Sequence, residues 1–353
     1  MFYQAAIESI EQMTSDSVNI RLSVAPELNP GFKYLAGQYL VIRIPSHDPA
    51  EHRSYSLSEA PSENILQIGV KRLVGGNIST YLCTQAKKGD VVELMAPQGT
   101  FLIPPSSNIK NIVAFAAGSG ITPIIAMIKT VLSSDKDAVI TLFYGNKDAE
   151  STMYRQDLAN LTNLYVSRFE CINIYSQQRT GLADLEGRIS PEKVSRWSQY
   201  LFSLNNTDLY LICGPGSMVS DLEKHLIATG VEKSKILTEL FTSPVEDNPA
   251  IDIQTNVLNS DFLIKVKFEK KLFEISAHSN DSVILDLGIK SGLDLPYSCK
   301  SGVCSTCQAK LISGEVRMDN NYVLSDSELK QGFILTCQSH ALTPIVEVDY
   351  DMK

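Results

Sequence analysis

Residues 296–308 read PYSCKSGVCSTCQ and place Cys299, Cys304 and Cys307 at C-x4-C-x2-C spacing. A fourth cysteine, Cys337, follows thirty residues later in ILTCQS. This spacing is typical of plant-type chains that hold a two-iron, two-sulfur cluster through four thiolates. The small residues between the cysteines allow the backbone to fold tightly and to point N–H groups at sulfur. We therefore predict an electron-transfer centre with these four cysteines as its metal ligands.

A structural zinc site is the alternative for the four cysteines. Such sites usually pair two C-x2-C knuckles, whereas only one half of this set has that form. The remaining cysteines, Cys83, Cys171 and Cys213, lie far apart along the chain. In a cytosolic protein this use of cysteine favours metal binding over disulfides, and the full spacing favours iron and sulfur.

The size and composition of the chain suit a soluble protein of two or three domains. It has 353 residues, of which 44% are hydrophobic and 20% are charged, and its formal net charge is −9. No stretch is basic enough to follow a phosphate backbone, so nucleic acid is not an expected partner. Residues 1–18 lack the positively charged and apolar regions of a signal peptide, so we expect a cytoplasmic location.

One uncharged run, Ile112–Ile128, approaches the length of a short membrane span. Gly118, Gly120 and Pro123 interrupt it, which favours a buried strand, a glycine turn and the start of a helix. We therefore expect no membrane insertion.

Turn signals and hydrophobic periodicity divide the chain into three domains and a linker. Residues 1–104 contain short alternating strands separated by Gly and Pro, which predicts an antiparallel β-barrel. Residues 105–242 alternate buried strands with helical stretches, as in a doubly wound parallel α/β sheet. Residues 243–260 hold two prolines, three acids and no base, and are expected to be a linker. Residues 261–353 combine a hairpin, a helix, the cysteine loop and a final strand, which predicts a small α+β domain.

The barrel segment contains two patterns that together favour a flavin. On a predicted strand, Arg53, Tyr55 and Ser56 of RSYSLS offer a positive charge for a diphosphate, an aromatic face and a hydroxyl. A half-exposed polar strand is the alternative for this pattern alone. Further on, KRLVGGNIS places two glycines and a hydroxyl just before a predicted helix start, where phosphate binds readily. The residues concerned are Gly75, Gly76 and Ser79.

Two glycine-containing turns follow predicted strands of the second domain. AAGSGITP, residues 116–123, comes after a buried strand and opens a helix, so its backbone can approach a diphosphate at a helix N-terminus. Pro123 stands where the third glycine of G-x-G-x-x-G would be, and proline suits the first turn of a helix. CGPGSM, residues 213–218, ends a central strand, where ligands of open α/β sheets bind. A small buried hydrophobic residue is the alternative for Cys213.

In this order, RSYSLS, GGNIS, AAGSGITP and CGPGSM resemble the flavin and nicotinamide signatures of the ferredoxin–NADP reductase superfamily. With the cysteine pattern added, the whole chain is similar to the hybrid reductases that serve bacterial oxygenases. The resemblance implies FAD as the flavin and a β-grasp, ferredoxin-type C-terminal domain. It also implies an oxidoreductase that passes electrons from NAD(P)H through FAD to a [2Fe–2S] cluster and on to an oxygenase.

The resemblance assigns roles to individual residues of this chain. Those implied to bind cofactors are Arg53, Tyr55, Ser56, Gly75, Gly76, Ser79, Gly118, Gly120, Thr122, Pro123, Arg179 and Phe241. Those implied to be catalytic are Ser56, Cys213 and Glu239. Glu239 and Phe241 match the family's E-x-F pattern at the end of the nucleotide-binding domain, and Ser56 is placed near the flavin N5.

Two further expectations concern the nicotinamide cofactor and the electron acceptor. NADPH is favoured over NADH, and its 2′-phosphate needs cations that the family places after two strands of the second domain. Here those segments are Asn146–Lys147 and Ser176–Arg179, with Arg155 as another candidate. The expected acceptor is an oxygenase component that binds transiently, with phenylacetyl-CoA epoxidase as the first candidate. A steroid or aromatic-ring hydroxylase, or a stand-alone NAD(P)H:acceptor reductase, are the alternatives.

Overall fold

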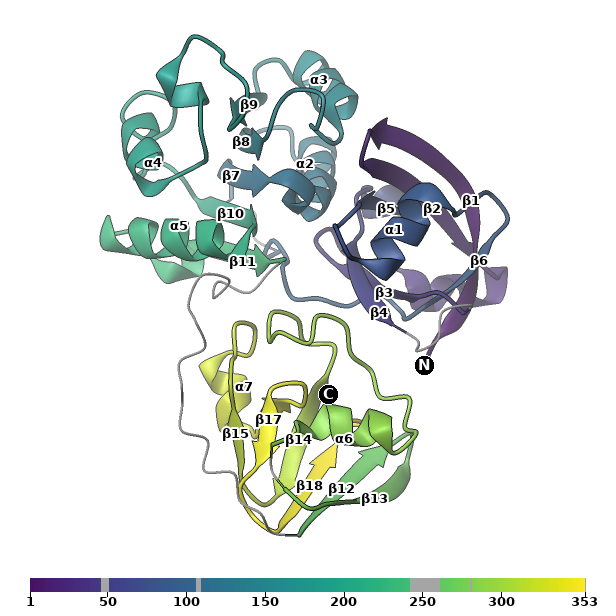
Figure 1. Cartoon of the computed structure of the whole chain (residues 1–353). Coiled ribbons are helices and arrows are strands. Elements are labelled where there is room, and N and C mark those ends of the chain that lie inside the picture. Colours follow the sequence, from purple (N-terminus) through teal and green to yellow (C-terminus); the bar gives the residue numbers. More distant parts are fainter. Residues whose placement is uncertain (46–50, 106–108, 242–260, 280, 353) are drawn as a thin grey trace. The chain divides into compact units, whose positions relative to one another are not determined.

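The computed structural model describes all residues except 46–50, 106–108, 242–260, 280 and 353. The chain forms two compact units, Met1–Pro244 and Val245–Lys353, which are drawn in Figure 1. The linker predicted at 243–260 lies outside the described residues. None of the helices in the described part is long and apolar enough to cross a membrane.

The first unit begins with six antiparallel strands in the order β4-β3-β6-β1-β2-β5. Their bounds are β1 (Tyr3–Thr14), β2 (Ser17–Val24), β3 (Tyr39–Arg43), β4 (His52–Ser56), β5 (Leu66–Lys71) and β6 (Val91–Leu94). A bridge between Leu57 and Ile68 joins the two edge strands, so the sheet closes as a barrel. Helix α1 (Asn77–Thr84) starts directly after Gly76, where the sequence predicts a helix start. The predicted antiparallel barrel is confirmed.

The second half of this unit is a parallel sheet in the order β11-β10-β7-β8-β9. The strands are β7 (Asn111–Ala117), β8 (Val139–Asn146), β9 (Phe169–Tyr175), β10 (Leu209–Gly214) and β11 (Ile236–Leu240). The helices are α2 (Ile121–Ser134), α3 (Arg155–Leu164), α4 (Pro191–Trp197) and α5 (Gly216–Ala228). Helices α2 and α3 cover one face of the sheet and α4 and α5 the other (Figure 1), and their side chains pack into the core on each face. The predicted doubly wound α/β sheet is confirmed.

An aromatic stack forms the centre of the α4/α5 face. The rings of Phe143 and Trp197 lie 4.5 Å apart between centroids, and those of Phe115 and Phe143 lie 5.2 Å apart. All three side chains are fully buried. Because each strand of a parallel sheet is covered on both faces, its residues are apolar almost without interruption, and this is the pattern that identifies β7 and β10 in the sequence.

The second unit is a five-stranded mixed sheet, β13-β12-β18-β14-β16, with a separate pair β15-β17. The strands are β12 (Phe262–Phe268), β13 (Lys271–Ala277), β14 (Gln308–Ser313), β15 (Val316–Met318), β16 (Phe333–Leu335), β17 (Ser339–Ala341) and β18 (Ile345–Asp349). Helix α6 (Ile284–Lys290) contributes Ile284 and Leu285 to its core. Helix α7 (Asp326–Lys330) begins with a capping box of Ser325 and Glu328. This is the predicted small α+β domain.

Replacing Phe143 with alanine should destabilise the nucleotide-binding half of the first unit by about 3–5 kcal/mol, because it leaves a cavity in a fully buried stack. Trp197 is the one tryptophan of the chain and packs on Phe143, so its fluorescence follows unfolding of this half directly. Denaturant titration of Leu164→Ala, an exposed position, is the control and should change the unfolding free energy by less than about 0.5 kcal/mol. Equal losses of unfolding free energy in the two variants would contradict a stabilising role for the aromatic stack.

Candidate functional site

Strand pairing brings the two cysteine segments of the second unit together. Cys299, Cys304 and Cys307 lie in the loop between α6 and β14, and Cys337 lies between β16 and β17. β14 and β16 pair antiparallel, with Gln308 opposite Leu335, so the residues that flank this pair meet at the same end. The Thr336 hydroxyl donates a 2.9 Å hydrogen bond to the carbonyl of Cys307 and fixes that approach.

The four thiols contact one another. Cys299 shares hydrogen bonds with Cys304 and Cys337, and Cys307 shares one with Cys337. The thiols that donate to Cys299 lower its pKa, and the same bond to Cys299 raises the pKa of Cys304. The backbone N–H of Ser301 donates to Cys299 Sγ at 3.4 Å, as expected of a loop that points N–H groups at sulfur.

This arrangement fits a two-metal cluster. A [2Fe–2S] cluster takes two thiolates on each iron, which suits four cysteines in paired contact. Thiolate sulfur is a soft donor of the kind that iron–sulfur clusters use. Cys304, Cys307 and Cys337 are buried, so their sulfurs are shielded from water. These residues would hold the cluster.

Gln338 supports the cluster loop and was not predicted from the sequence. Its Nε2 donates to the carbonyl of Lys300 at 3.0 Å and lies 3.7 Å from Cys337 Sγ. Its Oε1 accepts a 3.1 Å hydrogen bond from Asn320. The side chain thus joins the two cysteine segments, a role that a glutamine after a cysteine does not signal by itself.

The predicted flavin residues lie on β4 and at the start of α1. Ser56 is buried, whereas Arg53 is exposed and its guanidinium lies 3.2 Å from Glu51. Burial raises the pKa of Tyr55, so its phenol stays neutral. Gly75 has φ +78° in the turn before α1, a conformation that glycine adopts readily. The Ser79 hydroxyl accepts a 3.1 Å hydrogen bond from the Leu73 N–H and closes that turn.

The glycine turn after β7 closes tightly on β10. A Cβ on Gly120 would lie 2.3 Å from the carbonyl oxygen of Cys213, so only glycine permits this approach. Gly118 adopts φ +55°, and the Thr122 hydroxyl donates to the Ser119 carbonyl at 3.0 Å. Pro123 occupies the first turn of α2, as predicted. The backbone N–H groups of this turn therefore lie at the N-terminus of α2, a position that can stabilise a bound diphosphate.

A thiol and an acid meet beside this turn. In the parallel register, Cys213 on β10 lies opposite Glu239 on β11, and Cys213 Sγ lies 4.0 Å from Glu239 Oε2. Burial raises the pKa of Glu239 to about 8, so the carboxyl keeps its proton at neutral pH. Burial, and then Glu239, raise the pKa of Cys213 well above its usual value. Phe241 follows β11, and its N–H donates to the Gly214 carbonyl at 3.3 Å.

The segments considered for the 2′-phosphate lie together. The N–H of Ser176 donates to the Asn146 carbonyl at 2.9 Å, and that of Gln177 donates to the Lys147 carbonyl at 2.8 Å. The ends of β8 and β9 are thereby joined, with Lys147 and Arg179 beside them. Arg179 is exposed. Hydrogen bonds from the backbone N–H groups of Thr180 and Gly181, and to a smaller extent the charge of Arg179, lower the pKa of Glu186.

Comparison with known proteins identifies three domains in this chain. Residues 4–103 match the oxidoreductase FAD-binding domain, residues 115–224 the oxidoreductase NAD-binding domain, and residues 266–342 the 2Fe-2S iron-sulfur cluster binding domain. The fold is also that of phthalate dioxygenase reductase, with a TM-score of 0.62 at 24% identity over 99% of this chain and 98% of that one.

Two curated relatives span nearly the whole chain. One of the subunits of 1,2-phenylacetyl-CoA epoxidase from Escherichia coli strain K12 is 34% identical, over 100% of this chain and 98% of the relative. The ferredoxin reductase component of 3-ketosteroid-9-alpha-monooxygenase from Rhodococcus rhodochrous is 27% identical, over 98% and 95%. The chain therefore belongs to the family of FAD- and NAD-binding oxidoreductases with a 2Fe-2S domain that act as the electron-transfer components of oxygenases.

Proposed function

We propose that this protein takes electrons from NADPH and delivers them, through FAD and a [2Fe–2S] cluster held by Cys299, Cys304, Cys307 and Cys337, to an oxygenase. The observation that carries the proposal is the presence in one chain of a paired four-cysteine site and a glycine turn closed against Cys213. Bound FAD accepts electrons in pairs and releases them singly, which matches a nicotinamide donor to a one-electron cluster.

The residues around Cys213 would control charge where electrons enter. Glu239 holds its proton on the carboxyl group below about pH 8, and Cys213 stays a neutral thiol because its pKa is raised. A site without buried negative charge favours the arrival of electrons. Ser56 would supply a hydroxyl to the flavin from β4, while Arg53, Gly75 and the N-terminus of α1 would receive the diphosphate.

Phenylacetyl-CoA epoxidase is the oxygenase that we propose first as acceptor. The support is the 34% identity to the epoxidase relative over the full length of both chains. The relative that serves a 3-ketosteroid monooxygenase covers slightly less of the chain at lower identity, which makes a steroid hydroxylase the second candidate. Transfer assays with the purified oxygenase components of both systems would separate these acceptors, and failure with both would favour a stand-alone reductase.

Cys337→Ser should remove the cluster and leave the flavin step intact, because Cys337 is a ligand far in sequence from the first unit. The variant should lose the broad visible absorbance of the cluster and transfer to the oxygenase, yet still reduce a small dye with NADPH. Cys171→Ser, outside the ligand set, is the control and should keep both activities. Loss of dye reduction from a folded, FAD-containing Cys337→Ser protein would contradict the proposed order of transfer.

The rate of FAD reduction by saturating NADPH should fall as the pH rises through about 8. Above that pH Glu239 becomes a carboxylate, and its negative charge opposes incoming electrons. Stopped-flow absorbance between pH 6 and 9.5 measures this rate. Glu239→Gln cannot ionise and should show a flat profile over the same range. An unchanged fall in the glutamine variant would assign the titration to another group.

Replacing Arg179 with alanine should raise the KM for NADPH about tenfold and leave that for NADH unchanged. A charge-assisted hydrogen bond contributes about 1.5–3 kcal/mol, and tenfold in affinity corresponds to about 1.4 kcal/mol. Arg188→Ala, an exposed arginine of the same half, is the control. Equal effects on the two cofactors would exclude Arg179 as a 2′-phosphate ligand and leave Lys147 and Arg155 as candidates.

A further inference from the structure

Tyr154 has an unusual backbone and a buried side chain. It directly precedes α3 with φ +55° and ψ 23°, a left-handed conformation that bulky residues rarely adopt. Its side chain is 2% exposed. The surrounding contacts must therefore hold the residue in place, and such positions are often found where function requires a fixed geometry.

The phenol of Tyr154 reaches from the nucleotide-binding half into the barrel. Its hydroxyl lies 2.8 Å from Ser58 Oγ and 3.0 Å from Asn19 Oδ1, and both of these residues belong to the barrel. Burial raises the pKa of Tyr154, so the group is a neutral phenol. Ser58 in turn donates to the Gln67 carbonyl at 3.2 Å, which ties the contact to β5.

Gly69 on β5 makes this close approach possible. A Cβ at Gly69 would lie 2.5 Å from the Tyr154 hydroxyl and 2.8 Å from Cγ2 of Thr122. Thr122 belongs to the glycine turn at the start of α2. One residue of the barrel therefore faces both the Tyr154 hydroxyl and the turn that would receive the nicotinamide dinucleotide.

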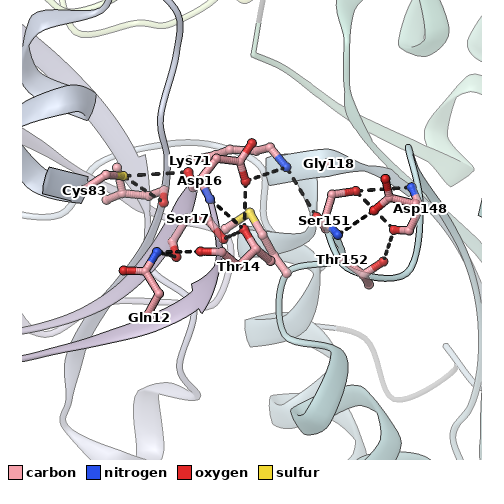
Figure 2. A network of polar contacts seen from close by, with 12 residues as sticks. Gln12, Thr14, Asp16, Ser17, Lys71, Cys83, Gly118, Asp148, Ser151 and Thr152 are labelled. Atoms are coloured by element: carbon pink, nitrogen blue, oxygen red, sulfur yellow. Dashed lines mark hydrogen bonds and ion pairs between the residues drawn. The ribbon is translucent and has the colours of Figure 1, made fainter. Parts of the chain in front are cut away.

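The loop before Tyr154 is fixed to the barrel by polar contacts. Lys71 at the end of β5 donates to the Ser151 carbonyl at 3.3 Å and pairs with Asp16 at 3.4 Å, as Figure 2 shows. Asp148 caps the loop by accepting from the Ser151 N–H at 2.8 Å. The loop that leads to the residue carrying the phenol is thus anchored to the end of β5.

A mostly buried ion pair adds a second connection between the halves. Lys129 of α2 lies 2.8 Å from Glu59, and their side chains are 16% and 13% exposed. Glu59 directly follows Ser58, so the ion pair and the Tyr154 hydrogen bond hold neighbouring residues of the barrel. The segment that follows β4 is therefore attached to α2 and to the start of α3.

We propose that Tyr154 is a positioning residue for electron transfer from nicotinamide to FAD. Its hydroxyl holds Ser58, two residues beyond Ser56 and on the same face of an extended segment, while its ring packs beside Thr122 at Gly69. Tyr154 thereby sets the distance between the strand that would contact the flavin and the turn that would hold the dinucleotide. Displacements of about 1 Å between reacting groups can cost about 100-fold in rate.

The test measures FAD reduction by NADPH in single-turnover stopped flow with Tyr154→Phe, which keeps the ring and removes the hydroxyl. The limiting rate should fall about tenfold, as a displacement below 1 Å would produce, while the dissociation constant for NADPH and the FAD content stay unchanged. Gly69→Ala should lower the rate further, since its Cβ displaces both neighbours. Tyr165→Phe, at the other end of α3, is the matched control and should react as wild type.

Dithionite reduction of FAD and the cluster in each variant should be complete, which restricts the defect to the nicotinamide step. A wild-type rate in Tyr154→Phe would overturn the positioning role. A weaker affinity for NADPH with an unchanged limiting rate would overturn it as well, because it would assign the hydroxyl to binding. A wild-type protein reduced by neither NADPH nor NADH would overturn both this role and the family activity on which it rests.

Discussion

The first unit depends on one row of residues that lie side by side on neighbouring strands of the parallel sheet. β10 lies between β7 and β11, and this register puts Ala116, Cys213 and Glu239 side by side. The missing side chain of Gly120 lets the turn after β7 close directly on that row. The glycine turn, the thiol and the protonated acid are thus brought by backbone pairing to one edge of the sheet, where ligands of open α/β sheets bind.

In the second unit, antiparallel strand pairing brings the four cysteines together. Three of them lie in one loop, and the fourth lies thirty residues further along the chain. The β14–β16 pair brings the fourth to the other three, and Gln338 and Thr336 then tie Cys337 to the loop. Burial of the sulfurs shields the donor set, and hydrogen bonds to sulfur are a means by which proteins adjust cluster potential.

Features with a strong local pattern could be predicted from the sequence. The apolar strands β7 and β10, the glycine turn and the cysteine loop each have a composition or spacing that few alternatives share. β1 has no such pattern, because a register shift between Ile7 and Ser9 breaks its alternation. Tyr154 and Gln338 act through contacts with segments distant in sequence, and no local pattern reports such contacts. The roles of Ser56 and Arg179 toward cofactors remain predictions.

In the proposed route, electrons reach the cluster only through FAD. Rapid freeze-quench EPR after mixing the protein with NADPH tests this route, with flavin absorbance followed in parallel. Flavin absorbance should fall before the signal of the reduced cluster appears. In protein stripped of FAD, the cluster should stay oxidised with NADPH and be reduced by dithionite. Reduction of the cluster by NADPH at the same rate without FAD would exclude this route.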